Sequence, residues 1–209
     1  MKDKKIPIVF LTKLIQYTVI IYQIFYSIYI RFRRKKQSPK VFCIGFSKTG
    51  TSSLNKALGI LGYRNIHWLH AHIEPSIGWV KFIKKTPYDA FSDAPMYQLN
   101  LFKELDKEFP HSKFIFTPRD PKSLAKSWRN YFTYASWGHT NVEDKKALIN
   151  MYEKHKNDVY SYFEKNPQRL LIMDIISGDK WDILCSFLNK PIPTIPFPYK
   201  RKARYKKNR

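Results

Sequence analysis

The sequence predicts a three-layer α/β domain with a mainly parallel central sheet, preceded by an N-terminal hydrophobic helix. Two short apolar runs, residues 40–45 and 113–117, each lead through a turn into a segment whose apolar residues recur at helical spacing. Strands buried in a parallel sheet are apolar throughout, and helices connect them. Because 44% of the 209 residues are hydrophobic, the chain can fill one such core, and two cysteines are too few for a disulfide-held scaffold.

Composition divides the chain into three predicted parts. Residues 1–37 form a membrane-anchor helix with its basic flank, residues 38–199 form the main domain, and residues 200–209 form a basic tail. The net charge is +22, of which residues 31–40 carry +6 and residues 200–209 carry +7. Because so much of the charge lies in short segments, we expect these to be solvated or to contact a membrane surface, and we expect no specific nucleic-acid partner.

The N-terminal segment, residues 6–30, is apolar apart from interruptions such as Lys13, Gln16 and Gln23. As a helix it would be about 37 Å long, which is enough to span a bilayer, so we expect a single spanning anchor. The polar residues fall near one stripe of the helix, so a helix lying in the membrane plane and a helix docked on its own domain remain open. The stronger basic flank after the segment favours the cytoplasmic face for the domain, with the Golgi lumen as the alternative.

The first strand–turn–helix unit contains a loop suited to an anion. Strand 40–45 is followed by the loop 46–50, and a helix is expected from Thr51. Backbone N–H groups and a helix N-terminus converge at such a turn, and Lys48 adds a full positive charge. A Walker A loop has its lysine directly after the last glycine, whereas Lys48 lies two residues before Gly50, which weakens the interpretation as a nucleoside triphosphatase.

The second unit places two polar residues near the same edge of the sheet. Arg119 follows the strand 113–117, and Ser127 lies two turns into the helix predicted over residues 122–132. Both side chains could reach one ligand group in the crevice at the carboxyl ends of the strands. The alternative is an ion pair between Arg119 and Asp120 that caps the helix.

Residues 42–54, FCIGFSKTGTSSL, closely resemble the phosphosulfate-binding loop of sulfotransferases that use 3′-phosphoadenosine 5′-phosphosulfate (PAPS). Arg119 and Ser127 match the 3′-phosphate-binding pair of that family in type and spacing. The resemblance extends over about residues 40–198. It implies transfer of a sulfuryl group from PAPS, without a metal, to a hydroxyl or amine of a carbohydrate, lipid or small metabolite.

The resemblance also implies roles for individual residues. Lys48 would be catalytic, contacting the bridging oxygen between phosphate and sulfate, while Arg119 and Ser127 would bind the 3′-phosphate. Ser53 stands where many relatives carry a tryptophan that stacks on adenine. The loop expected to bind the donor, with its backbone N–H groups and hydroxyls around the 5′-phosphate, comprises Lys48, Thr49, Gly50, Thr51, Ser52 and Ser53.

The acceptor also needs a general base, which the family places just after a strand facing the loop. Asp93 occupies that place here and is our first candidate. His67, His70 and His72 form a competing cluster. Asp93 as an ordinary helix cap remains an alternative.

Two further functions stay open at this point. A nucleotide or small-metabolite kinase could use a similar loop, but it would require ATP and Mg²⁺. A non-catalytic basic protein that binds membrane or RNA would show strongly salt-dependent binding that survives replacement of Lys48 and Arg119.

Overall fold

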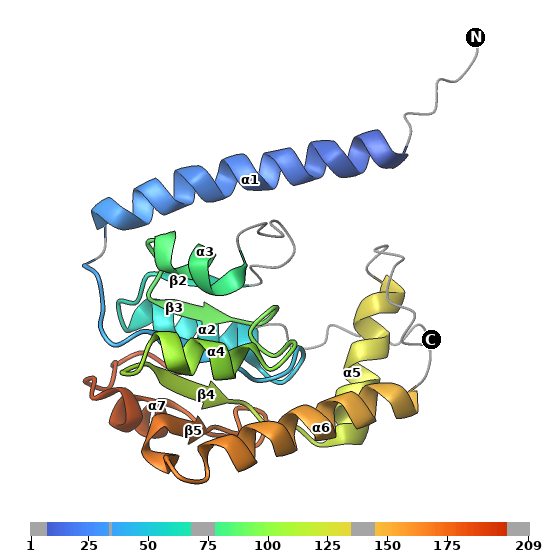
Figure 1. Cartoon of the computed structure of the whole chain (residues 1–209), viewed down its shortest axis with the longest axis vertical. Helices are drawn as coiled ribbons and strands as arrows, with labels where there is room; N and C mark the ends of the chain where they lie inside the picture. The colour runs from blue at the N-terminus through green and yellow to red at the C-terminus, as the bar shows by residue number, and fades with distance from the viewer. Residues whose placement is uncertain (1–7, 34, 68–77, 135–144, 200–209) are drawn as a thin grey trace.

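The computed structural model describes residues 8–33, 35–67, 78–134 and 145–199, and Figure 1 shows how their elements are arranged. Within these residues, five short strands form one parallel sheet in the order β2-β3-β1-β4-β5. Val41 is level with Ala90 on one neighbouring strand and with Lys113 on the other, so three strands begin together. The strands are β1 (Val41–Cys43), β2 (Asn65–His67), β3 (Ala90–Ser92), β4 (Lys113–Phe116) and β5 (Leu170–Ile172).

Helices cover both faces of the sheet because the apolar side chains of each strand alternate between two cores. In β1, Val41 and Cys43 belong to the core with α2 and α7, whereas Phe42 belongs to the core with α3 to α6. This arrangement confirms the predicted α/β fold with a parallel central sheet. The helices are α1 (Ile8–Arg33), α2 (Thr51–Ile60), α3 (Trp79–Lys85), α4 (Leu101–Glu108), α5 (Pro121–Tyr134), α6 (Lys145–Phe163) and α7 (Trp181–Leu188), with a 3₁₀ turn at Pro167–Arg169.

The strand order creates a switch point beside β1. After β1 the chain crosses to β2 and β3 on one side, and β4 and β5 are then added on the other side. The helices that follow β1 and β4, α2 and α5, therefore pack on opposite faces of the sheet, and open α/β sheets bind ligands at the carboxyl edge beside such a point. The predicted donor loop and Arg119 both lie at this edge.

The end of α1 is attached to the domain. Ile30 is only 1% exposed and belongs to one of the two cores, and the ring of Tyr26 stacks on that of Tyr88 at 6.4 Å. The Arg64 side chain donates a hydrogen bond to the Arg31 carbonyl at 3.3 Å. No helix among the described residues is both long and apolar enough to cross a membrane, so the predicted spanning anchor is not supported.

Candidate active site

The loop between β1 and α2 contains two residues with a left-handed backbone. Lys48 and Gly50 both have a positive φ, at 72° and 101°, and these two residues turn the chain sharply into the helix. The N–H groups of Ser53 and Leu54 bond to the Gly50 carbonyl and so begin α2. The N–H groups that precede them, at the first turn, have no acceptor within the helix and present partial positive charge at the carboxyl edge of the sheet.

Buried contacts hold this loop against β4. The Thr49 hydroxyl is 2.6 Å from the Phe46 carbonyl and 2.6 Å from the Thr117 hydroxyl. At Gly45, an added Cβ would lie 1.9 Å from Thr117 Oγ1, so a larger residue would push the two strand ends apart. Thr49 therefore supports the loop through its side chain, while its backbone remains part of the predicted cradle.

The Arg119 side chain reaches the loop. Its Nη1 donates to the carbonyl of Lys48, and Nε and Nη2 lie 3.2 and 3.1 Å from the Ser123 hydroxyl. Its backbone N–H donates to the Tyr152 hydroxyl at 3.0 Å. Ser127, the predicted partner, lies one turn further along α5 and is half-buried. Ser123 was not predicted, although it lies in the first turn of α5, only four residues after Arg119.

The alternative role for Asp120 is realised in part. Its carboxylate accepts the Ser123 N–H at 2.7 Å and so caps α5, in which Pro121 is the first residue. Asp120 thus orients the helix that carries Ser123, while the Arg119 guanidinium contacts the loop.

Asp93 lies directly after β3, with a φ of 68°, and its carboxylate faces the loop. Oδ1 accepts hydrogen bonds from the Ser47 hydroxyl and from the Ala94 N–H, and Oδ2 accepts one from the Thr51 hydroxyl at 3.1 Å. The next helix, α4, begins at Leu101, so Asp93 does not act as its cap. The predicted base is therefore bound to the predicted donor loop.

His67, at the end of β2, lies in the same network. Its Nε2 is 3.4 Å from Asp93 Oδ2 and 3.0 Å from Ser52 Oγ, and its Nδ1 is 2.9 Å from Ser92 Oγ. The Ser92 hydroxyl donates toward Asn55 Oδ1 at 3.1 Å, so it accepts from His67 Nδ1–H. In neutral His67 this leaves the lone pair on Nε2 beside Asp93 and the loop. His70 and His72 lie outside the described residues.

Two more residues complete the network and were missed by the sequence analysis. Ser47 lies 3.1 Å from the hydroxyl of Tyr97, which burial and the nearby Asp93 carboxylate keep protonated by raising its pKa to about 12. No motif marks Ser47 or Tyr97 in the sequence, but their closeness to Lys48 and Asp93 along the chain was a usable signal.

Ser53, which was predicted to belong to the donor-binding loop, is buried in α2.

A buried histidine on α6 supports the start of the loop at the end of β1. His155, on α6, donates Nε2–H to the carbonyl of Ile44, 2.8 Å away, and its ring packs near those of Phe46 and Tyr97. Burial lowers the pKa of His155, so the ring is neutral and serves as a donor. The end of β1 is thereby fixed to α6.

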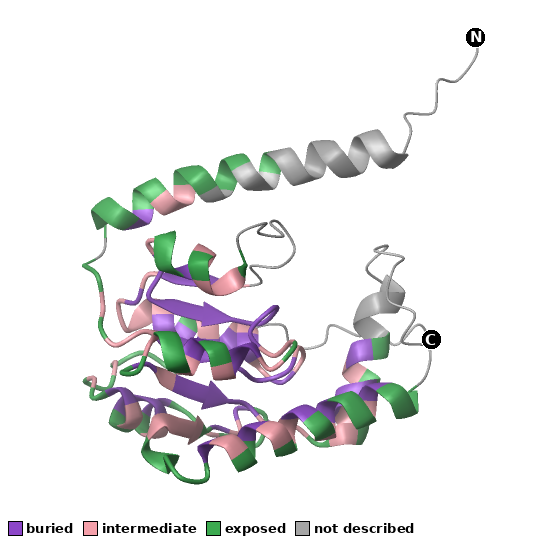
Figure 2. Ribbon diagram, viewed as in Figure 1, coloured by how far each residue is buried: buried purple, intermediate pink, exposed green. Residues whose placement is uncertain are grey.

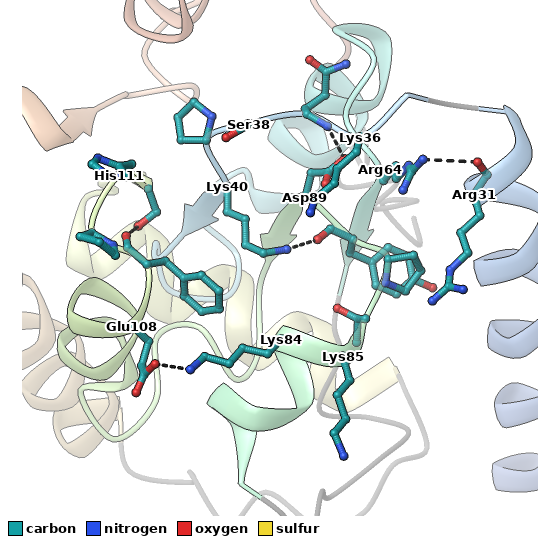
Figure 3. Close-up of a pocket in the computed structure, with 18 residues that line it drawn as sticks. Arg31, Lys36, Ser38, Lys40, Arg64, Lys84, Lys85, Asp89, Glu108 and His111 are labelled. Carbon is teal, nitrogen blue, oxygen red and sulfur yellow. Dashed lines mark hydrogen bonds and ion pairs between the residues drawn. The ribbon is translucent and has the colours of Figure 1, made fainter.

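A cavity of about 970 Å³ lies elsewhere, at the amino edge of the sheet (Figure 3). It is lined by segments that precede β1, β3 and β4, and none of the predicted site residues lines it. Two of its lysines are engaged at its walls: Lys40 donates to the Tyr88 carbonyl, and Lys84 pairs with Glu108. The lining includes Arg31, Lys36, Lys40, Arg64, Lys84, Lys85, Asp89, Glu108 and His111.

Comparison with known proteins assigns a family. No match was found among curated proteins. The sulfotransferase domain family matches residues 40–141 and 129–205, two overlapping segments that cover well over half of the chain. These segments include the loop, the base candidates and Arg119, and the parallel α/β fold agrees with the match. The chain therefore belongs to the sulfotransferase family, as the sequence resemblance predicted.

Proposed function

We propose that this protein transfers a sulfuryl group from PAPS to a hydroxyl or amine acceptor. The observation that carries the proposal is the hydrogen-bond network that joins the anion-binding loop to the candidate bases. Thr51 bonds to Asp93, and Ser52 bonds to His67. A sulfotransferase must hold the donor and deprotonate the acceptor at one place, and this network brings both functions together.

The donor would bind through three groups at the carboxyl edge of the sheet. The N-terminus of α2 and the Lys48 ammonium attract the 5′-phosphosulfate. Arg119 and Ser127 bind the 3′-phosphate, and Ser123 holds the guanidinium of Arg119 in place. The left-handed backbone at Lys48 and Gly50 supports this binding mode, because it directs the N-terminus of α2 toward the proposed position of the 5′-phosphosulfate.

In the transfer step, the acceptor oxygen or nitrogen forms a bond to sulfur while the bond from sulfur to the bridging oxygen breaks. Negative charge then builds on the leaving phosphate, and Lys48 is the group that stabilises it. The bisphosphate leaves as the second product. Stabilisation by a positioned lysine makes a metal unnecessary for this step.

We assign the acceptor proton to His67 Nε2. The Asp93 carboxylate already accepts hydrogen bonds from Ser47, Thr51 and Ala94, whereas the lone pair on Nε2 of neutral His67 faces only the Ser52 hydroxyl of the donor loop among the hydrogen-bond partners given above. After proton transfer, the imidazolium would lie 3.4 Å from Asp93 Oδ2, which stabilises the new charge. His67 is therefore the proposed base, and Asp93 is the carboxylate that positions and charges it.

Donor binding would also release this base. The Ser52 hydroxyl, which is expected to bind the 5′-phosphate, lies 3.0 Å from His67 Nε2 in the absence of donor. If the hydroxyl turns to the phosphate, Nε2 becomes available to the acceptor. The base would then act only when PAPS is present.

The experiment is transfer of ³⁵S from labelled PAPS to lipid, oligosaccharide and small-metabolite fractions. We expect wild-type protein to label one fraction, and His67→Gln and Asp93→Asn to lower turnover by about 100-fold or more without weakening bisphosphate binding. His111→Gln, at the opposite edge of the sheet, is the matched control and should keep full activity. Failure of the wild type to consume PAPS would refute the function, and full activity of both site variants would refute the assignment of the base.

A further inference from the structure

We propose that α1 lies in the plane of an anionic membrane surface, with the domain attached to its other side. The proposal goes beyond the transfer reaction and does not rest on it. It concerns the part of the helix from Thr18 to Arg33, most of whose described residues are exposed (Figure 2).

This part of α1 has two unlike faces. Successive residues of a helix are turned by about 100°, so the buried Ile30 points opposite to an apolar stripe one residue wide in each turn. The side chains of this stripe are about half to almost fully exposed: Ile21 53%, Phe25 68%, Ile28 47% and Phe32 86%. Ile24 and Tyr29 widen it and are also exposed. A contiguous exposed stripe of six large apolar or aromatic side chains marks an interaction surface.

Basic residues border this apolar face. Arg31 and Arg33 project on its two flanks, and Lys35 and Lys36 follow the helix, all of them exposed. Residues 4–73 contain no aspartate or glutamate. An apolar face between cationic flanks matches the boundary between acyl chains and anionic headgroups.

The contacts of α1 with the domain leave only the opposite face of the helix available to lipid, so the helix would lie parallel to the membrane surface. Tyr26 stacks on Tyr88, Ile30 is inserted in the core, and the Arg31 carbonyl is bonded to Arg64. Residues held in this way cannot be surrounded by lipid, whereas the opposite face can enter the interface. The sequence left open both a helix in the membrane plane and a helix docked on its own domain. In this proposal α1 does both, with one face on the domain and the other at the membrane.

The charge pattern favours a lipid surface over a second copy of the chain. Two α1 faces placed together would bring two sets of arginines and lysines into contact, with no acidic residue of either segment to neutralise them. An anionic bilayer supplies the opposite charge.

The test uses the full chain with a fluorophore attached at Phe25→Cys or Phe32→Cys. The native Cys43 and Cys185 are buried, so labelling is directed to the new thiol. The two positions are about 10 Å apart along the helix axis. With phosphatidylcholine–phosphatidylserine vesicles, we expect both labels to be quenched equally by lipids that carry a shallow quencher and weakly by lipids with a deep one. Unequal depths of the two labels would overturn the in-plane arrangement and indicate a spanning helix.

Matched variants test the two parts of the face. Phe25→Glu/Ile28→Glu should abolish vesicle binding, whereas Met151→Glu/Ile192→Glu, which makes the same charge change at exposed apolar residues elsewhere, should retain it. Arg33→Gln/Lys35→Gln/Lys36→Gln should weaken binding to anionic vesicles about 100-fold, or roughly five-fold per charge. If the wild type does not bind vesicles and instead forms a dimer that Phe25→Glu/Ile28→Glu dissociates, the face is an interface between copies and the proposal is wrong.

Discussion

The two edges of the sheet are both rich in polar and basic residues, but they are built differently. At the carboxyl edge, Asp93 accepts a hydrogen bond from Thr51 and lies 3.4 Å from His67 Nε2, beside a loop with left-handed residues. At the amino edge, a cavity is lined by four lysines, of which Lys40 bonds to a backbone carbonyl and Lys84 pairs with a surface glutamate. Parallel strands explain the difference, because each strand end at the carboxyl edge leads toward the N-terminus of a helix. Preorganised donors, and not volume or charge alone, distinguish the candidate active site.

Among variants at the two edges, replacement of Lys48 should give the largest loss of activity. In Lys48→Ala the leaving phosphate loses its positioned cation, and we expect kcat to fall about 1,000-fold, equivalent to about 4 kcal/mol. Lys85→Ala, which removes a lysine from the amino-edge cavity, should leave kcat unchanged. Steady-state turnover of PAPS measures both, and equal losses in the two variants would remove the distinction between the edges.

The packing beneath the loop should be nearly as sensitive. Gly45→Ala would place a Cβ 1.9 Å from Thr117 Oγ1, and we expect it to lower the free energy of unfolding by about 3 kcal/mol. Gly78→Ala is the comparison: its φ of 80° strains the backbone of any larger residue, but its Cβ would meet nothing within 4 Å, so it carries a backbone cost without a steric clash. Urea denaturation separates the two, and a smaller effect at Gly45 than at Gly78 would show that the loop is not held against β4.

Arg119 should govern affinity more than turnover. Arg119→Ala removes the cation at the 3′-phosphate, so bisphosphate binding should weaken about 10- to 100-fold. Ser123→Ala, which only loosens the guanidinium, should weaken it a few-fold. Arg64→Ala, at the amino edge, should bind the bisphosphate as the wild type does. Calorimetry measures the affinity of the three variants, and a loss in Arg64→Ala as large as that in Arg119→Ala would contradict the prediction.

The smallest expected effect is the pH dependence of stability that arises from His155. Burial lowers the pKa of His155 in the folded protein, so below about pH 6.5 the unfolded chain binds a proton that the folded chain does not. Stability should therefore fall as the pH decreases, by at most about 1.4 kcal/mol per pH unit for this group.

His155→Gln keeps a donor for the Ile44 carbonyl and should flatten this slope, whereas His111→Gln at the surface should not. Thermal unfolding between pH 7 and about pH 5 provides the measurement. An unchanged slope in His155→Gln would mean that other groups control the acid limit.

Much of the fold could be predicted from local pattern. The apolar runs 40–45 and 113–117 contain β1 and β4, and the helix predicted over residues 122–132 lies within α5. Strand–turn–helix units of this kind carry their own periodicity, so they can be recognised without knowledge of the partners. The spanning anchor could not be judged in this way, because the insertion of Ile30 into the core depends on a surface formed by distant segments.

The site was predictable where it follows the backbone and less so where it depends on tertiary contact. Lys48, Asp93 and Arg119 follow strands that lie side by side, so sequence position alone brings them to one edge. Ser123 and Tyr97 act through side-chain partners 4 and 50 residues away in the chain, and no motif records those pairs. The coupling of Ser52 to His67 has the same origin, since β2 reaches the edge only by pairing with β3.

The central claim is that the carboxyl edge binds PAPS, and the most direct test is calorimetric titration of the full chain with three ligands. These are 3′-phosphoadenosine 5′-phosphate, adenosine 5′-phosphate, and ATP with Mg²⁺. Our account predicts that the bisphosphate binds at least ten-fold more tightly than either of the others, because only it engages both the loop and Arg119. Tighter binding of ATP with Mg²⁺ would contradict the account and favour a kinase, and absence of binding by all three would leave the basic, apolar α1 face as the main clue to function.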